Sequence, residues 1–210
     1  MVQNNKEEVP FAHYVQAFAA LDPAAAVERC QVPFDAESGW FSLQLLGKDC
    51  QIHWPDYQIR GEEGCLALTS LPAQTFLLRY LLEGKSVASG GTWKTFREMP
   101  WGEMYIQPYT GRCLTRAAFT FGTRTKQFAA ACQAMGAKRL PHGDCAFELP
   151  VLDNYAMQII VWEGDDEFPP SAQLLYSDNF ASGFAAEDRV VAGDLLITAI
   201  KAKMNEEMRA

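Results

Sequence analysis

The chain has 210 residues, of which 49% are hydrophobic and 21% are charged, and its formal net charge at pH 7 is −8. This composition is typical of a globular protein, and the acidic total argues against non-specific binding of nucleic acids. The polar start of the chain lacks the basic-then-apolar pattern of a signal peptide. The apolar runs are also far shorter than the about 20 residues that span a bilayer. We therefore expect a cytoplasmic protein without a membrane segment.

Six cysteines and three histidines are scattered singly along the chain, and no C-x-x-C pair occurs. Zinc sites and iron–sulfur clusters need soft ligands that lie close together. The sequence therefore contains no motif for either kind of site, and most of the cysteines are expected to be small buried residues.

A polar arm at residues 1–10 precedes the first predicted helix. Apolar residues recur at helical spacing over residues 11–27, with a break near Asp22-Pro23, where Asp22 would cap a second short helix. The stretch 40–54 has apolar residues on both sides of a Gly-containing turn and predicts a β-hairpin.

The charged segment 60–64 is predicted to be a surface loop. It leads into the clearest helical pattern in the chain, residues 66–83, which Gly84 would end. A turn-rich segment follows, and helical spacing then predicts two helices, at residues 115–121 and 125–135.

Residues 145–149 are predicted to form a short strand. In the next stretch, 155–178, two apolar runs flank a group of carboxylates, a pattern that indicates a strand, an acidic loop and a second strand. Helical spacing returns at 185–208, interrupted by Gly193. Together these elements predict one α+β domain over residues 11–210, with a mixed or antiparallel sheet whose hairpins pack against several helices.

The charges are unevenly distributed. Residues 85–140 carry 9 basic and 2 acidic side chains, whereas the parts of the chain on either side are acidic. Either these blocks neutralise each other across the fold, or the basic block forms a site for phosphate or carboxylate groups. Aromatic residues such as Trp93 and Tyr105 alternate with Arg97 and Arg112 in this block. Such an arrangement can stack a flat ligand or seal a loop onto the core.

The acidic loop, residues 163–170, contains four carboxylates. Carboxylate oxygens are the ligands that Mg²⁺ and Ca²⁺ prefer, so Asp165, Asp166 and Glu167 are candidate metal ligands, although their spacing is not that of an EF-hand. Apolar neighbours of the loop predict that some of its carboxylates are partly buried and ion-paired. The predicted partners are Arg97, Arg112, Arg116 and Arg124. A metal or polar-ligand site and a fully solvated loop are the alternatives.

Three segments, residues 90–105, 121–152 and 161–180, resemble the uncharacterised prokaryotic family called domain of unknown function 3786. The resemblance extends over about residues 13–196 and implies kinship without implying a chemical activity. Such proteins are typical of anaerobic bacteria and archaea, and some relatives carry a cysteine-rich iron–sulfur region that this chain lacks. The family pattern Pro-Thr-Glu-Asp is replaced here by Ala185-Ala186-Glu187-Asp188. The loss of a Thr cap costs about 1 kcal/mol and puts the start of that helix in doubt.

Three functions are compatible with the sequence, which has no recognisable catalytic motif. The first is a ligand-binding or sensor module, in which the basic block and the acidic loop face each other across a cleft and grip a small polar or anionic molecule. The second is an adaptor that binds an unidentified protein partner. The third is an enzyme that uses a divalent metal on a phosphate or carboxylate substrate. The predicted ligand-binding residues are Trp93, Arg97, Glu98, Tyr105, Arg112, Glu163, Asp165, Asp166 and Glu167.

Overall fold

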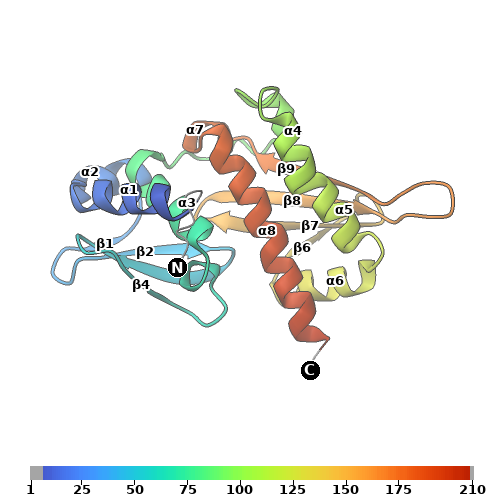
Figure 1. The fold of residues 1–210 in the computed structure, drawn as a ribbon, viewed down its shortest axis with the longest axis horizontal. Coiled ribbons are helices and arrows are strands. Elements are labelled where there is room, and N and C mark those ends of the chain that lie inside the picture. Colours follow the sequence, from blue (N-terminus) through green and yellow to red (C-terminus); the bar gives the residue numbers. More distant parts are fainter. Residues whose placement is uncertain (1–6, 209–210) are drawn as a thin grey trace.

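The middle of the β-sheet is formed by three neighbouring strands, β7 (Cys145–Leu152), β8 (Tyr155–Trp162) and β9 (Ser171–Ser177). The computed structural model describes residues 7–208, and Figure 1 shows these strands crossing its centre. Antiparallel pairing places Phe147 opposite Ile159 and Ile159 opposite Leu174. Because successive residues of a strand point to opposite faces, these three side chains share one face, where they are buried in the core.

The other strands extend this sheet at both edges. The strand order is β4-β3-β2-β7-β8-β9-β5, with β1 paired to β2 and β6 paired to β7, and every pairing is antiparallel. The nine strands of the described chain therefore form one open antiparallel sheet. The outer strands are β1 (Phe34–Asp35), β2 (Trp40–Leu45), β3 (Lys48–His53), β4 (Gln58–Gly61), β5 (Trp93–Thr95) and β6 (Lys138–Leu140).

The longest helix, α8 (Ala186–Glu207), runs across β7, β8 and β9 (Figure 1). Helices α5 and α6 lie beside it on one side, and α1, α2 and α3 lie on the other. The remaining helical elements are α1 (Glu8–Ala19), α2 (Pro23–Cys30), η1 (Leu66–Leu68), α3 (Leu71–Glu83), η2 (Phe96–Glu98), α4 (Ile106–Tyr109), the π-helix η3 (Thr110–Thr115), α5 (Arg116–Phe121), α6 (Thr125–Ala134) and α7 (Phe180–Gly183).

Most local predictions are confirmed. Asp22 caps α2, because its Oδ1 accepts a hydrogen bond of 3.0 Å from the Ala24 N–H. The predicted hairpin at 40–54 is β2 and β3, and the stretch 155–178 is β8, a loop and β9. The six cysteines are free and buried, as expected for small core residues. The predicted α+β class is thus correct, and the sheet is antiparallel.

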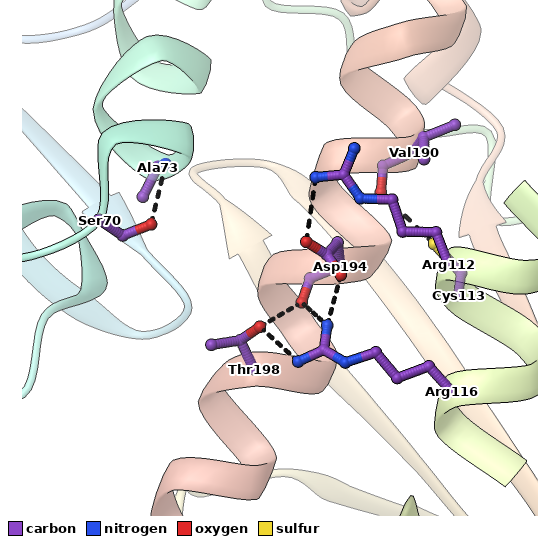
Figure 2. Close-up of polar contacts among 8 residues, drawn as sticks. All are labelled: Ser70, Ala73, Arg112, Cys113, Arg116, Val190, Asp194 and Thr198. Atoms are coloured by element: carbon purple, nitrogen blue, oxygen red, sulfur yellow. Dashed lines mark hydrogen bonds and ion pairs between the residues drawn. The ribbon is translucent and has the colours of Figure 1, made fainter. Parts of the chain in front are cut away.

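Other local predictions are wrong. The segment 60–64 is not wholly a loop, because β4 pairs with β3 up to Gly61. The pattern at 66–83 is divided into η1 and α3, since Ser70 caps α3 by accepting a hydrogen bond from the Ala73 N–H (Figure 2). The helix predicted to begin at Thr115 continues a helical run that begins nine residues earlier, at Ile106.

Gly193 does not interrupt α8. A Cβ atom at this position would lie 3.1 Å from both Cys113 Sγ and Tyr176 Oη. The glycine therefore allows η3 and β9 to approach the helix closely.

The predicted arm at residues 1–10 is only partly described. Residues 1–6 lie outside the described part of the chain, and α1 begins at Glu8. None of the helices in residues 7–208 combines the length and the apolar character that crossing a membrane requires.

The packing of the core predicts that two phenylalanines contribute very differently to the free energy of unfolding. Phe147 is 0% exposed and its ring lies 5.7 Å from that of Phe128, whereas Phe119 on α5 is 62% exposed. Replacing Phe147 with Ala should lower the free energy of unfolding by about 3–5 kcal/mol, since it leaves a cavity in the core. The matched change Phe119→Ala should alter it by no more than about 0.5 kcal/mol. Urea unfolding followed by circular dichroism measures both values, and equal values would contradict the described packing.

Candidate functional site

A cavity of about 650 Å³ lies where α8 begins. Its walls are the end of α3, the segment 100–105, α7 and the first residues of α8. Five charged residues line it: Arg79, Glu83, Glu187, Asp188 and Arg189. A concave site of this size that combines charged groups with apolar surface is suited to holding a small molecule.

The first turn of α8 lines this cavity, and its first N–H groups have no described acceptor in residues 7–208. The N-cap residue is Ala185, with φ −65° and ψ 166°, and its side chain supplies no capping hydrogen bond. The first N–H that is satisfied within the helix is that of Arg189, which donates to the Ala185 carbonyl at 3.1 Å. The N–H groups of the preceding turn carry the positive end of the helix dipole and favour a negative partner.

Arg189 is the most unusual residue of the cavity, because it is a cation that is only 1% exposed. Its Nε donates to the Ala185 carbonyl at 3.3 Å, and its Nη2 donates to the Pro100 carbonyl. Its Nη1 is buried and has no hydrogen-bond partner in the described part of the chain. Burial lowers the pKa of this guanidinium. Its hydrogen-bond acceptors are thus neutral carbonyls, while the charges of Asp188 and Glu187 oppose the lowering of its pKa without an ion pair.

The adjacent carboxylate, Asp188, is engaged elsewhere. Its Oδ1 lies 2.7 Å from Arg79 Nε, and Arg79 also donates from Nη1 to Tyr14 Oη at 2.8 Å. Burial raises the pKa of Asp188 to about 6, and the positive charge of Arg79 opposes that rise. Arg79 therefore forms an ion pair with Asp188, while Arg189 forms none in the part of the chain that the structure describes.

The rim of the cavity is apolar and exposed. Trp101 is 68% exposed and Met104 is 72% exposed. The Trp101 backbone has φ +64°, in the left-handed region that is uncommon for a residue with a side chain. Tyr105 completes this rim, and its hydroxyl donates a hydrogen bond to Glu187 Oε1, which raises the pKa of Tyr105. Tyr105 is one of the predicted ligand-binding residues.

The other predicted residues of the basic block have local partners. Arg97 Nε lies 3.1 Å from Glu103 Oε1, and Glu98 accepts a hydrogen bond of 2.7 Å from the Thr95 N–H, which lowers the pKa of Glu98. Trp93 is half-buried on β5, opposite Ser177 of β9.

Arg112 extends from η3 to α8 (Figure 2). Its Nη2 lies 3.1 Å from Asp194 Oδ2, and Arg116 contacts the same carboxylate through Oδ1. Arg116 also donates from Nη2 to Thr198 Oγ1 at 2.9 Å. These two arginines therefore fix η3 and α5 against α8.

The structure does not bring the acidic loop close to Trp93. The loop precedes β9 and Trp93 pairs with the last residue of that strand. A strand of seven residues is about 20 Å long. Trp93 and the acidic loop thus lie at opposite ends of β9, whereas Thr125, at the other end of the basic block, contacts Glu163 of the loop.

The prediction that the loop carboxylates are partly buried and paired with arginines is wrong. Residues 163–169 are exposed, which lets water relieve the repulsion among the carboxylates. The arginines that were expected to pair with them have other partners: Arg97 contacts Glu103, Arg112 and Arg116 contact Asp194, and Arg124 donates to the Thr120 carbonyl.

The loop carboxylates serve local contacts instead. Asp165 Oδ1 accepts hydrogen bonds from the N–H groups of Glu167 and Phe168, at 2.9 and 2.7 Å, and Glu163 accepts one from the Thr125 hydroxyl. Within residues 7–208, no group of three or more His, Cys, Asp or Glu side chains is placed to hold a metal ion. The geometry gives no support to Asp165, Asp166 and Glu167 as metal ligands.

A comparison of the chain with sequence families agrees with the resemblance of its segments. The family described as Domain of unknown function (DUF3786) matches residues 22–199. The chain belongs to this family. No curated protein and no solved structure matches the chain significantly. For this DUF3786 protein, membership supplies no activity, so the site has to be interpreted from its own geometry.

Of the residues that line the cavity, only Tyr105 was predicted from the sequence. Arg79, Asp188 and Arg189 were missed because nothing local distinguishes them from other charged residues. One signal was present, since Ala185-Ala186 opens a long helix without any of the usual capping residues.

Asp188 predicts a specific pH dependence of stability. Its pKa in the folded protein, about 6, is above its ordinary value of 3.8. The folded protein therefore binds this proton more tightly than the unfolded chain does, and this contribution to stability is lost as pH rises from about 4 to about 6.

We expect this loss in the wild type and not in Asp188→Asn. Asp166→Asn, on the exposed loop, is the matched control and should keep the wild-type slope. Urea unfolding of the three proteins across this pH range measures the effect. A wild-type slope that persists in Asp188→Asn would show that another group causes it.

Proposed function

We propose that this protein is a ligand-binding module that holds a small anionic molecule in the cavity at the start of α8. The proposal rests above all on Arg189, a cation that is 1% exposed and has an unpartnered Nη1 and no carboxylate partner in the described residues. The predicted function, a module that grips a small polar or anionic molecule, is retained. Its location is changed from the acidic loop to the first turn of α8.

The electrostatics of the cavity support an anionic ligand. A buried charge without a counter-charge is energetically unfavourable. A ligand that supplies the counter-charge would interact favourably with it. The free N–H groups at the start of a helix add hydrogen-bond donors and a positive dipole end, an arrangement that binds phosphate and carboxylate groups in many proteins. Arg189 and the first turn of α8 line the same cavity, so one anionic group would contact both.

The rim supports a ligand that also has an apolar part. Trp101 and Met104 expose large apolar surfaces to solvent at the edge of the cavity. Contact with a ligand would remove part of this surface from water, which contributes about 25 cal/mol per Å². The charged residues of the cavity would orient the ligand, and the apolar rim would increase the affinity.

Ala185→Asp tests the proposal directly. An aspartate at the N-cap would accept hydrogen bonds from the free N–H groups and place a negative charge where the ligand anion would lie. We expect inorganic phosphate or benzoate to bind the wild type and to bind this variant at least about tenfold more weakly. The variant itself should be about 1 kcal/mol more stable than the wild type. Calorimetric titration in chloride-free buffer measures the affinities.

Ala36→Asp is the matched control, because it makes the same change of charge at an exposed residue in the turn before β2. It should bind the probe anions as the wild type does. A second variant, Arg189→Gln, should also lose binding if it remains folded by circular dichroism. The proposal fails if neither anion binds the wild type, or if Ala185→Asp binds as tightly as Ala36→Asp.

The adaptor function is a second candidate, favoured by exposed aromatic residues near the acidic loop. Phe168 is 67% exposed and Trp162 is 37% exposed, and both adjoin the carboxylates of residues 163–167. We expect a basic protein partner to bind here and to be lost in Phe168→Asp, but not in Met104→Asp at the cavity rim. Co-purification from the native organism with each variant tests this, and equal recovery of a partner by both variants would contradict it.

A further inference from the structure

We infer that the ligand of this cavity is a zwitterion of the α-amino acid class, with its carboxylate at Arg189 and the first turn of α8 and its ammonium group at Glu187. This inference rests on the proposed function and specifies the ligand further. It is drawn from the balance of charges that line the cavity, from the positions of those charges on α8, and from the apolar rim.

The cavity is not simply a cationic site. Its charged residues are two arginines and three carboxylates, Glu83, Glu187 and Asp188, so it has one net negative charge when all five are ionised. A simple anion that binds at Arg189 adds to that negative charge, which limits its affinity, and a phosphate dianion adds more. Charge repulsion is strong where water is partly excluded. A ligand that brings a positive group with its carboxylate leaves the balance unchanged.

Only part of the acidic charge is already neutralised. Asp188 is 2.7 Å from Arg79, and Glu83 is 3.7 Å from the same guanidinium. Glu187 forms no ion pair within residues 7–208, and its described partner is the neutral hydroxyl of Tyr105. A carboxylate has about four acceptor positions, so Glu187 can bind an ammonium group while keeping this hydrogen bond.

Glu187 and Arg189 bring opposite charges to the same cavity. Glu187 is the second residue of α8, in the same turn as the uncapped N–H groups, and Arg189 is two residues further on. Both residues line the cavity, and the negative charge of Glu187 acts on the Arg189 guanidinium. An α-amino acid carries a carboxylate and an ammonium group and would therefore find a partner for each at the start of α8.

The size and rim of the cavity indicate the rest of the ligand. The volume of about 650 Å³ is larger than the two charged groups of an amino acid require, and Trp101 and Met104 are exposed at its edge. An amino acid with a large apolar side chain would place the charged groups against α8 and the side chain against this rim.

The experiment compares each amino acid with analogues that lack one charge. The twenty common L-amino acids are first tested with the full-length protein by thermal shift. The amino acid with the largest shift is then titrated by calorimetry beside its deaminated analogue, which keeps the carboxylate, and its decarboxylated analogue, which keeps the amine. We expect the amino acid to bind at least about tenfold more tightly than either analogue.

Two glutamine variants locate the ammonium site. Glu187→Gln should bind the amino acid and the deaminated analogue with similar affinity, because the group that recognises the ammonium is lost. Glu103→Gln is the matched control: it makes the same change in the neighbouring segment at a residue that pairs with Arg97, and it should keep the tenfold preference.

The outcomes separate this inference from the proposed function. If the deaminated analogue binds as tightly as the amino acid, or if Glu187→Gln keeps the preference, the zwitterion inference is overturned and the anion-binding module stands. The zwitterion inference is also overturned, and the anion-binding module stands, if no amino acid binds while phosphate or benzoate does. If neither amino acids nor these anions bind, both proposals are overturned.

Discussion

The buried guanidinium of Arg189 connects the elements around the start of α8. Its Nη2 donates a hydrogen bond to the Pro100 carbonyl in the segment before α4, and its Nε donates one to the Ala185 carbonyl before α8. The backbone carbonyl of Arg189 accepts a hydrogen bond of 2.9 Å from Tyr176 Oη on β9. The guanidinium carbon lies 5.7 Å from the ring centre of Phe96. Hydrogen bonds to carbonyls and an aromatic face reduce the cost of burying this cation, but they do not supply a counter-charge.

The rest of α8 is held firmly, and this fixes the position of its first turn. Arg112 and Arg116 both contact Asp194, in the middle of the helix, and Gly193 allows η3 and β9 to pack closely against it. Leu196, Ile197 and Ile200 are buried beyond that point. The uncapped N–H groups therefore have a set position before any ligand arrives. Such preorganisation reduces the entropy that binding would otherwise cost.

The sequence predicted the elements well because the signals for them are local. Alternating apolar residues and turn glycines determine a hairpin, and a side-chain cap such as Asp22 determines where a helix starts. The errors arose where contacts with residues distant in sequence determine the local structure. Gly193 looked like a helix break because the close approach of Cys113 and Tyr176 cannot be read from the chain.

The site was harder to predict than the fold, because the charges of a block need not act together. In the basic block at 85–140, Arg97 pairs with Glu103, and Arg112 and Arg116 pair with Asp194, rather than with the acidic loop. The carboxylates of the acidic loop are exposed to water, which reduces their mutual repulsion without any basic partner. Tyr105 was predicted because aromatic residues alternate with arginines in the basic block, and it lies at the rim of the cavity. Arg189, in an acidic stretch, had ample carboxylates nearby in sequence and no reason to be selected.

That sequence context makes the isolation of Arg189 informative. Glu187 and Asp188 directly precede it, yet each makes its described contact with another residue, Tyr105 or Arg79. Their negative charges act on the guanidinium, but neither carboxylate forms an ion pair with it in the described residues. A residue of the same face would have to come from three or four positions away, where Ala185 and Ala186 offer no carboxylate and Ala192 and Gly193 offer none. A carboxylate in direct contact with Arg189 must therefore come from another segment or from a bound molecule, and Arg189 is one of the residues that line the cavity.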